Sequence, residues 1–76
     1  MSEFIYKIEK QIVTLSDNGK LSTELNVVRF GNSEPKYDLR RWRRFLSDGE
    51  KKMQKGVTMT AEEVVKLRDA LNGLTL

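Results

Sequence analysis

The sequence contains neither cysteine nor histidine. It therefore cannot form a disulfide, and it lacks the residues that most often serve as nucleophile, as general base and as ligand of zinc, copper or haem. It also has no Gly-rich phosphate loop and no Asp-x-Asp spacing, and the adjacent Glu62 and Glu63 would point in different directions on a helix. We expect a protein that is not an enzyme and that uses no metal or other cofactor.

Long apolar segments are absent as well. No run of residues approaches the roughly 20 that a membrane span needs, and the first four residues lack the basic start of a signal peptide. The 76 residues allow a single domain, residues 1–76, whose core is thin because a chain this short buries only about 60% of its unfolded surface. We expect a cytoplasmic protein, associated with the nucleoid if it is bacterial, and reinforced by forming an oligomer.

The positive charge is concentrated in one segment. The net charge is only +3, but residues 36–55 contain eight basic residues and three acidic ones, while the segments on either side are slightly acidic. The stretch KYDLRRWRRF, residues 36–45, combines five basic residues with three aromatic ones. A local positive field of this kind indicates an anionic partner.

Four segments predict β-strands joined by tight connections. FIYKIEKQIVTL (residues 4–15) is rich in β-branched and aromatic residues, and Asn18-Gly19 favours a two-residue type I′ turn into a returning strand over 21–30. A Gly- and Pro-containing breaker then precedes a strand over 36–45, and Ser47-Asp48-Gly49 turns the chain into a shorter strand over 52–59. The pattern predicts an antiparallel meander of four strands.

The C-terminal segment predicts a helix that ends near Gly73. Thr60 and Glu63 have the spacing of a capping box, in which each side chain binds a free backbone N–H at the start of the helix. Apolar residues then recur at steps of three or four, which makes one apolar stripe. The stripe consists of Ala61, Val64, Leu67, Leu71 and Leu74. Because only the sheet is available to cover it, we expect an α+β fold in which the helix lies on the sheet.

Strand alternation divides the basic segment between two faces. One face carries Lys36, Asp38, Arg40, Trp42 and Arg44, and the face expected under the helix carries Tyr37, Leu39, Arg41, Arg43 and Phe45. In the second strand the uncovered face carries Ser22, Glu24, Asn26, Val28 and Phe30. Phe30 and Trp42 would then share an open, basic face.

Single-stranded nucleic acid fits such a face, because bases stack on rings while Arg and Lys bind phosphates. Sequence specificity should be low, with Asn26 as the clearest base-edge reader.

Less specific interpretations compete with this one. Trp42 alone is more often a core or dimer-interface residue, and Phe30 can simply close the edge of the core. RRWRR is typical of a solvated charged face or a nuclear-import patch, and Lys51, Lys52 and Lys55 of solvated lysines. A second functional hypothesis is a protein–protein interaction module that binds an acidic partner through the basic strand.

The motifs TELNVVRFGNSEPKYDLRRW and DGEKKMQKGVTMTAEEVVKLRDAL resemble the single-stranded-DNA-binding domain of the Positive Cofactor Four family of transcriptional coactivators, and its short YdbC-like bacterial members in particular. The resemblance implies a curved four-stranded sheet followed by one helix, in a homodimer formed largely through the helices. It also implies binding of single-stranded DNA, with RNA as the alternative nucleic acid, in transcription regulation or DNA maintenance.

Alternation, charge and this resemblance together give the expected site residues. The expected nucleic-acid-binding residues are Lys20, Asn26, Phe30, Lys36, Arg40, Trp42, Arg44, Lys52 and Lys55. The expected dimer-interface residues are Val64, Leu67, Leu71 and Leu74.

Overall fold

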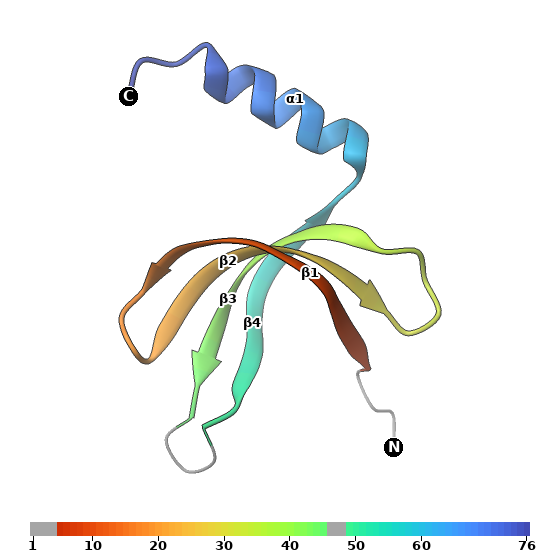
Figure 1. Cartoon of the computed structure of the whole chain (residues 1–76), viewed down its shortest axis with the longest axis vertical. Coiled ribbons are helices and arrows are strands. Elements are labelled where there is room, and N and C mark those ends of the chain that lie inside the picture. Colours follow the sequence, from red (N-terminus) through yellow and green to blue (C-terminus); the bar gives the residue numbers. More distant parts are fainter. Residues whose placement is uncertain (1–4, 46–48) are drawn as a thin grey trace.

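The computed structural model describes residues 5–45 and 49–76. The chain forms one four-stranded antiparallel sheet in the order β1-β2-β3-β4, followed by a single helix (Figure 1). The elements are β1 (Tyr6–Asp17), β2 (Leu21–Phe30), β3 (Lys36–Arg44), β4 (Lys51–Met59) and α1 (Ala61–Asn72). The predicted meander and helix are confirmed, and β1 lies two residues later than predicted. Phe4, which began the predicted first strand, and most of the predicted Ser47-Asp48-Gly49 turn lie outside the described residues.

The connection from β1 to β2 is not the predicted type I′ turn. That turn needs positive φ at Asn18, but only glycines have positive φ among the described residues, and Gly19 has φ 93°. The Asp17 carboxylate accepts a hydrogen bond from the Gly19 N–H (2.8 Å), and Asn18 Oδ1 accepts from the N–H groups of Lys20 (2.9 Å) and Leu21 (2.8 Å). These side chains satisfy the backbone of a three-residue connection, so only Gly19 needs the left-handed conformation.

The sheet is strongly curved, and irregular pairing produces the bend. The register of β1 against β2 shifts at three places, and that of β4 against β3 shifts between Arg40 and Trp42. Extra residues of this kind bend a strand and increase its twist. At the centre of the bend Gly56 pairs with Arg40, and a β-carbon at Gly56 would overlap the β-carbon of Arg40. The strands therefore arch, with α1 on the outer side of the arch (Figure 1).

The buried residues of the described chain all lie on the concave side of this arch, which we call the inner face. They are Ser22, Glu24, Asn26 and Val28 of β2, with Asp38 and Trp42 of β3. Cross-strand pairing places Asn26 beside Asp38 and Ser22 beside Trp42, which confirms that the two predicted sets share a face. The prediction that this face is open is wrong. Because the sheet curls, the inner side chains cover one another without needing a helix.

The helix has the predicted capping box but does not cover the sheet. Glu63 N–H donates to Thr60 Oγ1 (3.1 Å), and Thr60 N–H donates to Glu63 Oε1 (2.9 Å). Every residue of α1 except the half-buried Val64 is exposed. The stripe faces the predicted side of the sheet, since Val64, Leu67 and Leu71 line one groove of about 250 Å³ with Leu25 of β2. The groove is open, so the prediction that the sheet covers the stripe is wrong.

The described helix is too short and too polar to cross a membrane.

Candidate functional site

A partly buried ion pair between Asp38 and Arg40 lies on the inner face. Arg40 Nε donates to Asp38 Oδ1 (2.7 Å), and Arg40 Nη2 donates to Asp38 Oδ2 (2.6 Å). Arg40 Nη1 also donates to the backbone oxygen of Gln54 (3.1 Å), and the guanidinium lies 5.7 Å from the centroid of the Phe30 ring. A forked, charge-assisted contact of this kind is strong and directional. Arg40 is therefore held over Phe30, and its charge is paired with the Asp38 carboxylate.

A second buried carboxylate, that of Glu24, joins three neighbours. Its Oε2 accepts hydrogen bonds from Ser22 Oγ (2.7 Å) and Lys51 Nζ (2.8 Å), and its Oε1 accepts from Asn26 Nδ2 (3.3 Å). Burial raises the pKa of Glu24, but the hydrogen bonds from Lys51, Ser22 and Asn26 outweigh it and hold the pKa below the ordinary value of 4.5. Glu24 is therefore an anion at neutral pH and ties β2 to β4.

Trp42 belongs to this layer and is only 1% exposed. Its ring lies 5.6 Å from the Tyr6 ring at an interplanar angle of 57°, and Lys51 Nζ lies 5.7 Å from its centroid. Its indole N–H is buried and has no hydrogen-bond partner among residues 5–45 and 49–76. The expectation that Trp42 is an accessible ring on an open face is wrong, because the curvature places β1 and Lys51 against it. In the chain described here Trp42 is a core residue.

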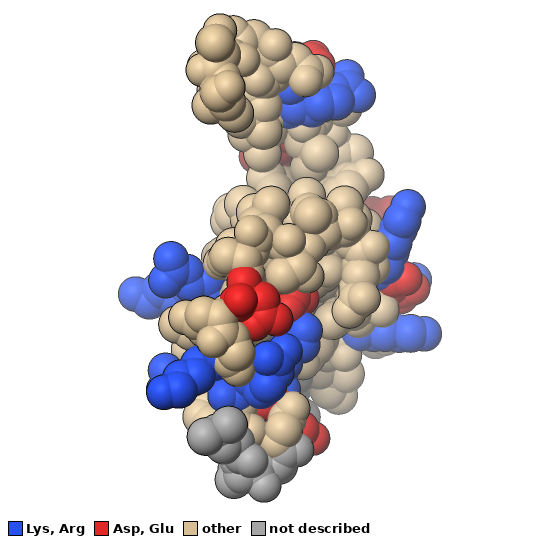
Figure 2. Space-filling view, turned by 60° about the vertical axis from the view of Figure 1, so that its left-hand side comes forward, with Lys and Arg blue, Asp and Glu red and all other residues tan. Residues whose placement is uncertain are grey.

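An accessible aromatic ring occurs instead where β3 ends beside the β1–β2 turn. There Lys20, Arg43, Arg44 and Phe45 line a groove of about 260 Å³, which we call the hairpin-end cluster. Phe45 is 36% exposed, and the cationic groups of Arg43 and Lys52 each lie 5.7 Å from its ring centroid. Lys and Arg side chains gather in this part of the surface in Figure 2.

Arg44 fixes the hairpin-end cluster to the β1–β2 turn. Its backbone N–H donates to the Lys20 oxygen (2.8 Å), and its Nη1 donates to the Gly19 oxygen (3.2 Å). Its Nη2 lies 3.7 Å from Asp17 Oδ2. A hydrogen bond from the Gly19 N–H is the main reason that the pKa of Asp17 lies below its ordinary value, and Arg44 lowers it further. The turn and the end of β3 therefore form one surface.

The predicted binding residues do not form a single continuous surface. Asn26 and Trp42 are buried on the inner face, with Arg40 and Phe30 beside them, and Lys36 is exposed at its rim. Lys20 and Arg44 lie in the hairpin-end cluster. Lys52 pairs with Arg43 and so points to the outer, convex face, while Lys55 is exposed at the β4 irregularity opposite Arg41. Whether these residues bind nucleic acid remains a prediction.

The sequence did not predict the surroundings of two residues, Phe45 and Lys51. Phe45 was assigned to the face expected under the helix, although its position directly after four arginines and a tryptophan in RRWRRF was a signal that cations would surround it. Lys51 was interpreted as a solvated lysine, whereas it pairs with the buried Glu24. No local signal in the sequence predicts the pairing of Lys51 with Glu24, because 27 positions separate them.

These features define a class of protein: a small curved sheet with one C-terminal helix, an ionic inner layer and basic, aromatic hairpin ends. The described residues contain no group of three or more side chains suited to hold a metal ion. Residues 20–70 match the family model described as Transcriptional Coactivator p15 (PC4), and the chain belongs to this family. It is also similar to an uncharacterized protein of Treponema pallidum (strain Nichols), with 40% identity over 75 residues that cover 97% of this chain and 84% of the relative.

Proposed function

We propose that this protein is a homodimeric, non-enzymatic binder of single-stranded DNA, with RNA as the alternative ligand, and that it has little sequence preference. Membership of the coactivator family supports a role in transcription regulation or DNA maintenance. The observation that carries the proposal is the hairpin-end cluster, where an accessible ring is surrounded by cations. Unpaired bases offer a face to such a ring, whereas a duplex keeps its bases stacked inside.

The cations of this surface supply electrostatic capture. Lys20, Arg43 and Lys52 are exposed and make no ion pair within the part of the chain that the structure describes. Their charges are therefore available to phosphate groups, unlike that of Arg40, which Asp38 holds. Capture by these side chains is followed by stacking of a base on Phe45. Lys36 and Lys55 extend the basic path along the rims of β3 and β4.

The buried inner layer has a supporting part in this proposal. Asp38 positions Arg40 against Phe30, and Glu24 positions Lys51 against Trp42. Asn26 hydrogen-bonds to Glu24 from within the same layer. We assign Trp42 and Asn26 to shaping the curved surface in the free protein. Phe30 and Arg40, closer to the rim, are the inner-face residues that a strand reaches first.

The exposed stripe of α1 supports the homodimer. Leu67, Leu71 and Leu74 are exposed large hydrophobic residues. Leu67 and Leu71 line an open groove together with Val64 and Leu25. Apolar surface of this extent on so small a chain favours burial against a partner. A second copy would fill the groove with the same stripe, as an isologous interface requires. The mass in solution should then be that of two chains, and Leu71→Glu should reduce it to that of one.

Competition for a fluorescently labelled oligo-dT tests the proposed function. We expect unlabelled oligo-dT to displace the label well, and duplex of equal length to displace it poorly. Polyglutamate represents the alternative acidic protein partner and should also compete poorly. Equal displacement by duplex would contradict a single-strand preference, and displacement by polyglutamate at lower concentrations than oligo-dT would favour the interaction-module hypothesis. Lys66→Ala removes one positive charge on the helix, away from the hairpin-end cluster, and is the matched control for the charge-removing variants described below.

A further inference from the structure

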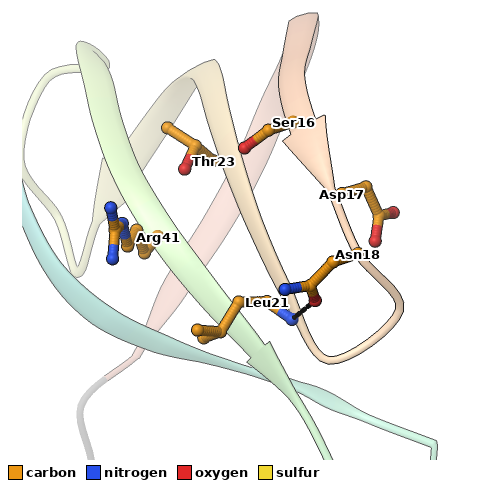
Figure 3. Close-up of a pocket in the computed structure, with 6 residues that line it drawn as sticks. All are labelled: Ser16, Asp17, Asn18, Leu21, Thr23 and Arg41. Atoms are coloured by element: carbon orange, nitrogen blue, oxygen red, sulfur yellow. Dashed lines mark hydrogen bonds between the residues drawn. The ribbon is translucent and has the colours of Figure 1, made fainter.

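The outer face of the sheet carries a small polar groove that the proposed function does not use. Ser16, Asp17, Asn18, Leu21, Thr23 and Arg41 line it, and its volume is about 260 Å³ (Figure 3). Pockets that enclose drug-sized ligands measure about 300–1,000 Å³, so this groove suits a small ion or a single group of a larger ligand.

Strand pairing places three of these residues in one row. Ser16 of β1 pairs with Thr23 of β2, and Thr23 pairs with Arg41 of β3. Directly paired side chains on one face lie about 4.5–5.5 Å apart at their β-carbons. Ser16 reaches this face because the register of β1 shifts between Thr14 and Ser16. Without the shift, simple alternation from Thr14 would have left Ser16 on the inner face.

The donors of the groove are unused. The side chains of Ser16, Thr23 and Arg41 make no hydrogen bond or ion pair with any residue in the ranges 5–45 and 49–76. Asn18 Oδ1 already accepts two backbone N–H groups, which fixes its amide and leaves Nδ2 as an additional donor. Figure 3 shows this nitrogen on the side of the groove, and the Asp17 carboxylate turned away from Thr23 and Arg41.

The donor set selects an anion with several oxygen atoms. The groove offers two hydroxyl groups, one amide and one guanidinium, and its single carboxylate is bound to the Gly19 N–H and lies near Arg44. A guanidinium fork can bind two oxygens of one ligand, and the hydroxyl and amide groups can donate to others. A carboxylate has only two oxygens, whereas a phosphate group has more. We propose that Ser16, Asn18, Thr23 and Arg41 bind a phosphate group on the outer face of the sheet.

The phosphate group could belong to a nucleic acid backbone or to a free phosphate, and the chemistry is the same for both. The site is independent of the hairpin-end cluster, because Arg41 and Thr23 contribute nothing to that groove. Arg41 is also the cation in this groove that favours an anionic ligand. It is exposed, makes no ion pair with the described residues and lies on the same face as Arg43, so it adds positive potential around the groove.

Nuclear magnetic resonance titration of the full chain tests this site, with inorganic phosphate as the first probe and sodium chloride at matched ionic strength as its control. We expect phosphate, and not chloride, to shift the backbone signals of Ser16, Asn18 and Thr23 and the Arg41 Nε–H signal. Arg41→Ala should weaken phosphate binding about tenfold or more, since hydrogen bonds to charged groups contribute about 1.5–3 kcal/mol. Thr23→Val, which keeps the side-chain shape, should weaken it less, and Lys66→Ala should leave it unchanged.

Oligo-dT is the second probe and distinguishes the two sources. If oligo-dT shifts the signals of Ser16, Thr23 and Arg41 at lower concentrations than inorganic phosphate does, the phosphate group is that of a nucleic acid strand. If only inorganic phosphate shifts these signals, the ligand is a small anion, and the proposal stands even if oligo-dT does not bind at all. Equal shifts with chloride, or phosphate shifts that persist unchanged in folded Arg41→Ala, would overturn the proposal.

Discussion

Lys51 and Glu24 form an ion pair across the inner face, with Nζ 2.8 Å from Oε2, although β3 lies between their strands. The pair passes over Trp42, whose ring centroid is 5.7 Å from the same Nζ. It therefore joins the two hairpins of the meander and closes the layer that buries the tryptophan. Truncating Lys51 would leave the buried Glu24 carboxylate without its cation, which is destabilising.

The first prediction concerns the pH dependence of this pair. The folded-state pKa of Glu24 lies below its ordinary value of 4.5, so its contribution to stability is present above about pH 4.5 and is lost as the pH falls through the lowered pKa. Glu24→Gln should lower the melting temperature at neutral pH, and the difference from the parent should shrink in acid. Thermal unfolding followed by circular dichroism across that range measures this. A difference that is constant with pH would show that the charge of Glu24 contributes nothing.

The second prediction concerns Gly56. A methyl group there would overlap the β-carbon of Arg40, so Gly56→Ala must push β4 away from β3 or bend it further. Overpacking of this kind costs about 1–3 kcal/mol of unfolding free energy. Gly73→Ala is the control, because its added β-carbon would meet the Ala70 oxygen at an ordinary 3.5 Å. Urea unfolding of both variants compares them directly, and equal stabilities would contradict the close approach at Gly56.

The third prediction concerns Trp42, the single tryptophan of the chain. Because Trp42 is buried, acrylamide should quench its fluorescence poorly in the free protein. Trp42→Ala should reduce the unfolding free energy by about 3–5 kcal/mol, as removal of a large buried side chain does. Efficient quenching together with an unchanged melting temperature would mean that the ring is exposed in solution.

The fourth prediction concerns Phe45. Phe45→Ala should weaken binding of oligo-dT by roughly 1–3 kcal/mol, the contribution of stacking one base on a ring. The melting temperature should fall less than in Trp42→Ala, since Phe45 is 36% exposed and Trp42 only 1%. Phe45→Leu keeps an apolar side chain without a ring and should bind as weakly as Phe45→Ala, whereas Phe45→Tyr should bind like the parent. If Leu restores full affinity, Phe45 contributes hydrophobic contact rather than stacking.

Local patterns in the sequence predicted the elements of this fold well. The limits of β2 agree with the structure, the capping box at Thr60 and Glu63 is present, and alternation grouped Phe30 with Trp42 on one face. Each of these depends on residues close together in the chain or on a simple strand period. The predicted helix stripe also faces the predicted side of the sheet.

Curvature is what the sequence did not predict from its residues. Alternation identifies two faces of the sheet but does not say which one is buried. A flat sheet under a helix would bury the helix side, whereas the sheet curved by the register shifts in β1 and β4 buries the opposite side. The ion pairs Asp38–Arg40 and Glu24–Lys51 then make a polar inner layer that hydrophobic patterning cannot find. The accessible ring is therefore that of Phe45 and not, as predicted, that of Trp42.

The salt dependence of oligo-dT binding tests the central claim most directly. If the basic rims and the hairpin-end cluster neutralise some 4–6 phosphates, the logarithm of the association constant should fall with the logarithm of salt concentration with a slope of about −3 to −4. Lys20→Ala should make that slope shallower by about one unit or slightly less, whereas Lys66→Ala should leave it unchanged. An affinity for oligo-dT that is independent of salt would contradict the account.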